Sequence, residues 1–394
     1  MIRSYGCPYP DESMPANPLI VCDVTLREGE QMPGVAFSLK EKQCLAQKLD
    51  DIGVDQIQLP LPRKDSRLIN EVKQICALGL RSKTEVMTSA KQDDWKEQID
   101  IAENVGADIL HSSFGVGAFT ATAWTREKQC DLEEKIDSVV RYMHSTGMQV
   151  NISFTDATRA DLNLLLGCVK TAVDAGAHRI RFADSFGITG PESWTRLITS
   201  ASALTKPKGV LLGAHCHNDL GLALADALAC IRAGTDIIDV SVNGIGDRAG
   251  NVCLEQLAVA MEVLYKRPTH ILPEKLTELC RYVSEISGIP IPVNKPLIGA
   301  NAFVEETAGH AIEQFEFPVE GRAICPEDFG GKLGVVYGKM TNERVIELTA
   351  QRAGRHIPSE MIPRLLASLA EYSERQKGLC IYENEFWAIV DSLK

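Results

Sequence analysis

The run VLLGAH at residues 210–215 is followed, after four residues, by LGLALADALACIRA at 220–233. This pair shows most clearly the strand–helix unit from which the fold of the chain is predicted. The first run is short and apolar, as is typical of a buried strand, and the second has the apolar spacing of a helix. Gly234 follows the helix and suits the left-handed conformation that ends many helices. Residues 210–234 therefore predict one strand followed by one helix.

The same unit recurs in both directions from this run. Predicted strands cover residues 19–24, 54–59, 83–87, 107–112, 149–154, 179–183, 210–215 and 237–242, and a helical pattern follows each of them. Eight successive units with none skipped predict an α/β fold, a (β/α)8 TIM barrel, over residues 18–268. A doubly wound open sheet is the alternative, but the Gly-x-Gly-x-x-Gly sequence typical after its first strand is absent.

Residues 269–394 have a different pattern. Prolines at positions 268, 273, 290, 292 and 296 interrupt it, and helices are expected only at 274–287, 342–353 and 361–376. These residues predict a helical, loop-rich region that contributes to the active site or to a dimer.

The composition narrows the class of protein. The 394 residues carry a net charge of −12 and include no block of Lys and Arg, which argues against nucleic acid or an anionic membrane as a partner. The 12 cysteines form no Cys-x-x-Cys pair and mostly lie in apolar patterns, which indicates free thiols in a reducing compartment. We therefore expect a cytoplasmic protein.

The ends of the first and seventh predicted strands carry the groups for chemistry. His215 and His217 are two residues apart, so their side chains point the same way from a strand. The first strand is followed by Glu28, and in a closed barrel it is a near neighbour of the seventh. Two imidazoles and one carboxylate predict a site for a divalent metal ion, and Mg²⁺, Mn²⁺ and Zn²⁺ are all compatible with it. Two unrelated histidines are the alternative reading.

A glycine-rich stretch, NGIGDRAGN at residues 243–251, follows the eighth predicted strand and precedes a helix. Glycines allow a backbone to approach a ligand closely, and a helix N-terminus attracts anions. A tight turn between strand and helix would use the same glycines, so this stretch alone assigns no function.

Four stretches together resemble the DRE-TIM metallolyase superfamily. They are DVTLREGEQ at 23–31, HCHNDLG at 215–221, NGIGDRAGN at 243–251 and NAFVEETAGH at 301–310. The match is closest to the Claisen-condensing branch, which comprises homocitrate, isopropylmalate and citramalate synthases, and LREGEQ is similar to the homocitrate synthases. The resemblance implies a homodimeric acyltransferase that condenses an acyl-CoA, in particular acetyl-CoA, with a 2-oxo acid.

The resemblance also implies roles for individual residues. Glu28, His215 and His217 would bind the metal ion, Arg27 would polarise the ketone oxygen, and His310 would act as acid and base. The residues implied in substrate binding are Gln31, Arg159, Ser185 and Asn243.

The chain departs from the family pattern at three places. Thr155-Asp156 stands where a Glu-Asp pair is usual, Asp184-Ser185 replaces Asp-Thr, and Gly321 or Arg322 stands where a Tyr is expected. Two alternatives to a synthase therefore remain: a metal-dependent lyase or aldolase on the same scaffold, and a degenerate, non-catalytic relative. The glycine-rich stretch has no cysteine, the nearest being Cys253, which disfavours an acyl-CoA lyase.

Overall fold

The computed structural model describes residues 2–3, 14, 18–60, 65–90, 94–117, 126–267, 269–317 and 324–394. The described residues divide into two compact units. The barrel unit ends at Pro290, and the C-terminal unit comprises Ile291–Lys394 together with Ile2 and Arg3. The boundary therefore lies about one helix beyond residue 268, where the change in sequence pattern placed it.

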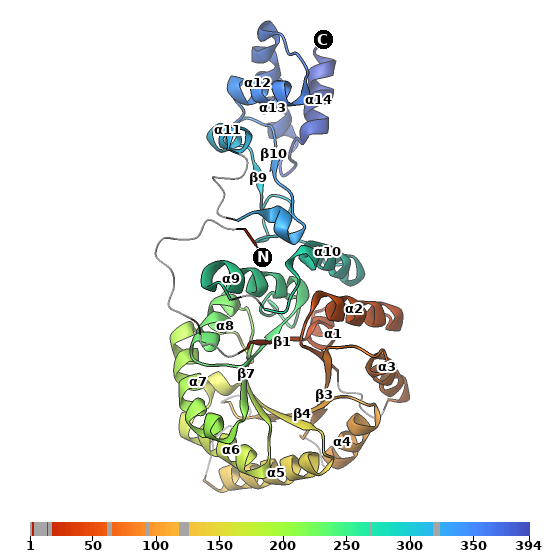
Figure 1. Ribbon diagram of the computed structural model, residues 1–394, viewed down its shortest axis with the longest axis vertical. Helices are drawn as coiled ribbons and strands as arrows, with labels where there is room; N and C mark the ends of the chain where they lie inside the picture. The colour runs from red at the N-terminus through yellow and green to blue at the C-terminus, as the bar shows by residue number, and fades with distance from the viewer. Residues whose placement is uncertain are drawn as a thin grey trace. The chain divides into compact units, whose positions relative to one another are not determined.

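Eight parallel strands form a closed barrel in the order of the chain, which confirms the predicted TIM barrel (Figure 1). The strands are β1 (Ile20–Asp23), β2 (Gln56–Leu59), β3 (Lys83–Ser89), β4 (Ile109–Gly115), β5 (Gln149–Thr155), β6 (Arg179–Asp184), β7 (Leu211–Cys216) and β8 (Ile237–Val240). The ring closes where β1 pairs with β8, with Ile20 opposite Ile237 and Asp23 opposite Val240.

Helices surround the strands on the outside of the ring (Figure 1). They are α2 (Leu39–Ile52), α3 (Ser66–Cys76), α4 (Trp95–Asn104), α5 (Arg126–Ser145), α6 (Leu162–Ala175), α7 (Pro191–Thr205), α8 (Ala223–Arg232), α9 (Leu254–Tyr265) and α10 (Leu276–Ser287). The short helix α1 (Thr25–Glu28) is a single turn that directly follows β1. Short 3₁₀ turns are η1 (Gly29–Gln31), η2 (Ala157–Arg159), η3 (Lys206–Lys208), η4 (Val242–Gly244) and η5 (Pro273–Lys275).

Local sequence explains where these helices begin and end. Ser38 and Glu41 form a capping box at the start of α2, each side chain accepting a hydrogen bond from the other residue's backbone N–H. Gly53 ends α2 with a φ of 98°, a left-handed conformation in which the missing Cβ removes the usual steric cost.

Helix α10 belongs to the barrel unit. The amide of Asn243 donates a hydrogen bond to the carbonyl of Cys280 at 2.8 Å, and Lys48 on α2 pairs with Glu278 at 3.0 Å. These contacts fix α10 beside the loop after β8 and beside α2. The sequence pattern had grouped this helix with the C-terminal region.

The C-terminal unit has its own core. Its elements are β9 (Val304–Glu305), α11 (Ala308–Glu316), η6 (Pro326–Phe329), β10 (Gly334–Val335), α12 (Glu343–Ala353), η7 (Ser359–Met361), α13 (Ile362–Arg375) and α14 (Glu383–Ser392). Tyr337 and Phe386 stack with ring centroids 4.1 Å apart, and Leu365 and Leu369 are buried with them. Helices α11 and α14 were not expected from the sequence.

Eleven cysteines are described and all are free thiols, in agreement with the sequence reading. No helix among the described ranges combines the length and the apolar character that crossing a membrane requires.

Candidate metal and substrate site

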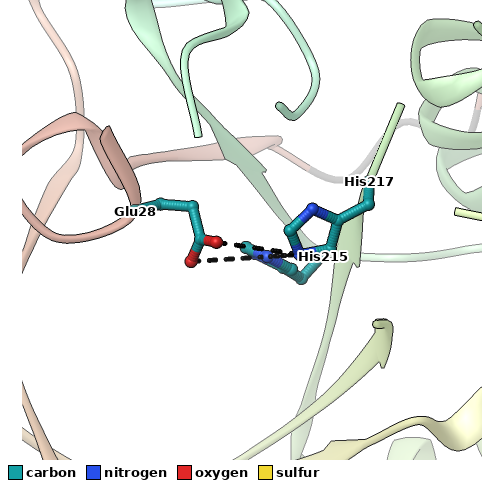
Figure 2. Close-up of side chains that lie close together, drawn as sticks. All are labelled: Glu28, His215 and His217. Carbon is teal, nitrogen blue, oxygen red and sulfur yellow. Dashed lines mark hydrogen bonds and ion pairs between the residues drawn. The ribbon is translucent and has the colours of Figure 1, made fainter. Parts of the chain in front are cut away.

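Glu28, His215 and His217 meet at the C-terminal end of the barrel. Glu28 ends α1, the single turn that follows β1, while His215 lies in β7 and His217 just beyond it. All three are buried, and one ligand atom from each lies within 4.8 Å of the others. Figure 2 shows the carboxylate facing both imidazoles, with Glu28 Oε1 3.7 Å from His217 Nε2 and Oε2 3.9 Å from His215 Nε2.

The protonation state of the two imidazoles suits a metal. His215 Nδ1 lies 2.9 Å from Asp239 Oδ2, and a carboxylate only accepts hydrogen bonds, so Nδ1 carries the proton and Nε2 keeps its lone pair. Burial lowers the pKa of His215, and burial with the adjacent His215 lowers the pKa of His217 to about 3. The two Nε2 atoms are 3.3 Å apart. Two neutral nitrogen donors and one carboxylate therefore fit a divalent cation.

Arg27 is held next to Glu28, one of the three metal-ligand candidates. Its Nη1 pairs with Glu28 Oε2, and its Nε donates to Gln58 Oε1 at 2.6 Å. Burial lowers the pKa of Arg27 to about 10, so the guanidinium keeps its charge at neutral pH. The guanidinium is therefore a fixed donor beside the metal-ligand candidates.

A buried charge network lies in the barrel next to Arg27. Arg181 donates to both oxygens of Glu85, at 2.7 and 3.2 Å, and its Nε lies 3.4 Å from Asp239 Oδ1. Burial would raise the pKa of Glu85, but Arg181 and His111 hold it well below the ordinary value. Gln58 donates to Glu85 Oε1 at 2.5 Å and so joins this network to Arg27. Because each of these charges has an opposite partner, the network can stay ionised without water.

A cavity of about 200 Å³ opens beside the trio. Among the predicted site residues it brings together Arg27, Glu28, Gln31, Ser185, His215 and His217. Its other lining residues are Met87, His111, Ser153, Thr155, Arg181, Ala183, Asp239 and Asp247. Sequence reasoning gave no site role to His111, Ser153, Arg181 or Asp239, which lie within apolar strand patterns. An inward polar residue in such a strand is the only signal that could have identified them.

Three predicted site residues lie outside this lining. Arg159 makes two 2.7 Å hydrogen bonds to Asp156 and stacks over Phe186, 4.2 Å from the ring centroid. Asn243 connects the loop after β8 to α10. His310 lies on α11 of the C-terminal unit, where its Nδ1 is 3.4 Å from Glu305 Oε2. The expected replacement at Gly321 or Arg322 falls outside the described residues.

The glycine-rich stretch packs directly on the metal-ligand candidates. A Cβ on Gly246 would come within 2.2 Å of Asn251 Oδ1 and 3.1 Å of Glu28 Cγ. A Cβ on Gly250 would lie 1.8 Å from the carbonyl oxygen of Gly244. Asn251 Nδ2 is 3.2 Å from His215 Nε2, so the stretch also brings an amide to the site. These glycines serve close backbone packing around the trio.

The model of the HMGL-like family matches residues 18–283, which covers all eight barrel strands and reaches into α10. The chain belongs to the HMGL-like family. This confirms the resemblance to the DRE-TIM superfamily that the four sequence stretches indicated.

Curated relatives match nearly the full length of the chain. A putative (R)-citramalate synthase of Methanopyrus kandleri is 33% identical over 367 residues, which is 93% of this chain and 71% of that protein. A 2-isopropylmalate synthase of Methanocaldococcus jannaschii is 34% identical, over 95% of this chain and 71% of its own. The homocitrate synthase AksA of the same organism is 32% identical, over 98% of this chain and 93% of its own. The similarity therefore includes the C-terminal unit.

Solved structures match the barrel. The hydroxymethylglutaryl-CoA lyase of Pseudomonas aeruginosa superposes with a TM-score of 0.59 at 17% identity, over 71% of this chain and 95% of its own. At this identity the likeness supports the barrel fold alone.

Proposed function

We propose that this protein is a metal-dependent acyltransferase that condenses an acyl-CoA, in particular acetyl-CoA, with a 2-oxo acid. Water then hydrolyses the thioester, which releases CoA as a free thiol and leaves a 2-hydroxy di- or tricarboxylic acid. The observation that carries the proposal is the convergence of Glu28, His215 and His217 beside Arg27 in one cavity. Relatives named as three kinds of synthase, each at 32% identity or more, support condensation over the lyase or aldolase alternative.

Glu28, His215 and His217 would hold one divalent cation. When bound, the cation would supply a Lewis acid and a template for the oxo and carboxylate oxygens of the acceptor. Asp239 fixes the proton of His215 on Nδ1, which leaves Nε2 as the ligand atom. All three side chains are buried at the wall of the cavity, which restricts the access of water to them.

Arg27 would stabilise the alkoxide that forms when the new carbon–carbon bond is made. Its guanidinium is oriented before substrate binds, because Glu28 and Gln58 hold two of its nitrogens. A donor fixed in a buried site stabilises developing negative charge without reorganisation at the moment of reaction. Gln31 and Ser185 line the same cavity and would bind substrate.

His310 would transfer the proton of the acyl-CoA methyl group. This role rests on the resemblance of residues 301–310 to the family segment that ends in a catalytic histidine. An imidazole titrates near neutral pH, so it can accept a proton and return it. Arg159 and Asn243 would act in substrate binding only indirectly, since neither lines the cavity. We further propose a homodimer, which light scattering of the purified protein would test.

The decisive experiment is an assay of free thiol release. The metal-loaded protein is incubated with acetyl-CoA and each of a panel of 2-oxo acids, and CoA thiol is measured over time. Thiol release that depends on both substrates, with a 2-hydroxy acid as product, is the expected result. Absence of release with every 2-oxo acid, from protein that binds metal, would contradict the proposal.

A further inference from the structure

Among the residues that the structure describes, one side of the cavity offers no free positive charge. Met87, His111, Ser153, Thr155 and Ala183 form this side, which we call the acceptor wall. They come from β3, β4, β5 and β6, which are consecutive in the barrel, whereas the metal-ligand candidates come from β7 and from the turn after β1. A substrate held by the trio would therefore extend its side chain toward the acceptor wall.

Both guanidiniums among the described lining residues already have carboxylate partners. Arg181 is bound by Glu85 through two hydrogen bonds and approached by Asp239 at 3.4 Å. Arg27 is paired with Glu28 on the opposite side of the cavity. Neither is free to balance a second carboxylate at the acceptor wall, and a buried carboxylate without a partner is strongly disfavoured.

His111 belongs to the same buried network and supplies no fixed charge to this wall. Its Nδ1 lies 2.9 Å from Glu85 Oε1 and 3.1 Å from Gln58 Nε2, and burial lowers the pKa of the imidazole, which favours its neutral form. Nε2 is buried and has no hydrogen-bond partner among the residues that the structure describes. A neutral imidazole cannot balance the charge of a second carboxylate, whereas a neutral side chain needs no such partner.

We infer that the acceptor is a short 2-oxo acid with a single carboxylate, whose neutral side chain lies against the acceptor wall. The inference rests on the proposed function and narrows it. A cavity of about 200 Å³ is smaller than the ~300–1,000 Å³ typical of sites for drug-sized ligands, which favours a short acceptor. Addition of a two-carbon acyl group to such an acceptor forms a 2-hydroxy dicarboxylic acid rather than a tricarboxylic acid.

Binding of a matched pair of acceptors tests this inference separately from turnover. 2-Oxopentanoate and 2-oxoglutarate have the same carbon chain and differ in one terminal carboxylate. Titration calorimetry with Mn²⁺-loaded protein should give a Kd for 2-oxopentanoate that is about 10²-fold lower than the Kd for 2-oxoglutarate. The reason is that 2-oxoglutarate must bury an unpaired charge. The pair 2-oxobutanoate and oxaloacetate should show the same preference at a shorter length.

A substitution at Thr155 can place a positive charge on the acceptor wall. Thr155→Lys places a cation on the acceptor wall and should reduce the preference for 2-oxopentanoate at least 10-fold, while Thr155→Met, of similar length and neutral, should retain it. The wild-type titration does not depend on how these variants fold.

The outcomes distinguish the inference from the function on which it rests. A wild-type Kd for 2-oxoglutarate equal to or lower than that for 2-oxopentanoate would overturn the inference and leave the synthase proposal standing. If no 2-oxo acid binds the Mn²⁺-loaded protein, the proposed function fails and the inference fails with it.

Discussion

At the scale of single residues, His217 is the most direct test of the metal site. Its imidazole is one of three donors, so His217→Ala should weaken divalent-metal binding by at least about 10²-fold, more than loss of a group that only supports a ligand. Chelator competition and metal analysis measure this. His144→Ala, which removes a histidine that stacks on His178 outside the site, should bind metal normally. Full occupancy and unchanged affinity in His217→Ala would refute the assignment.

Arg27 should matter for turnover more than for folding. Lysine cannot reproduce the paired contacts to Glu28 and Gln58, so Arg27→Lys should lower kcat by about 10²–10³, the usual effect of losing one fixed oxyanion donor. Initial rates of thiol release and the thermal unfolding midpoint measure the two effects. Arg141→Lys, at an exposed pair with Asp137, is the control and should change neither. Wild-type turnover in Arg27→Lys would remove this role.

The lowered pKa of His217 predicts that the free energy of unfolding of the metal-free protein depends on pH. Its pKa in the folded state is about 3, below the ordinary value of 6.5, so between these pH values the unfolded chain binds more protons. The stability that His217 contributes is therefore complete above pH 6.5 and is lost as pH falls toward 3. Urea unfolding between pH 7 and pH 4 should show that the free energy of unfolding falls more steeply with decreasing pH for wild type than for His217→Asn. Parallel curves would contradict this.

At the scale of an element, the loop after β8 is shaped by its contact with the trio. Gly246→Ala would drive a Cβ into Asn251 and toward Glu28, so it should weaken metal binding and lower the free energy of unfolding by about 1–3 kcal/mol. Gly190→Ala is the matched control, because its Cβ would meet only Glu192 Oε2 at 3.7 Å. Unchanged metal affinity in Gly246→Ala would show that the loop adapts.

At the scale of the whole molecule, the C-terminal unit would take part in the reaction through His310, which we propose as the group that transfers the methyl proton of the acyl-CoA. His310→Ala should retain metal and 2-oxo acid binding but lose the exchange of acyl-CoA methyl protons with solvent, because the base would be absent. Mass spectrometry of acetyl-CoA recovered from D₂O measures the exchange. His356→Ala changes another histidine of the same unit and should leave exchange intact. Exchange at the wild-type rate in His310→Ala would place the base elsewhere.

The sequence by itself determined the barrel and the metal-ligand candidates. Strand and helix periodicity is local, so eight βα units could be counted without knowing any long-range contact. The C-terminal ends of barrel strands converge at one face, so Glu28, His215 and His217 could be placed together from their positions after two strands. The four matching stretches added the family, which the comparisons bear out.

Only the tertiary structure decided the electrostatics of the site. Glu85, Arg181 and Asp239 lie in three different strands, and nothing local to any of them indicates its partner. Their pairing depends on barrel register and on which side chains point inward at the same height. That pairing fixes the proton on His215 and gives Arg181 two carboxylate partners. Long-range contacts set these properties because a buried charge is stable only beside an opposite one.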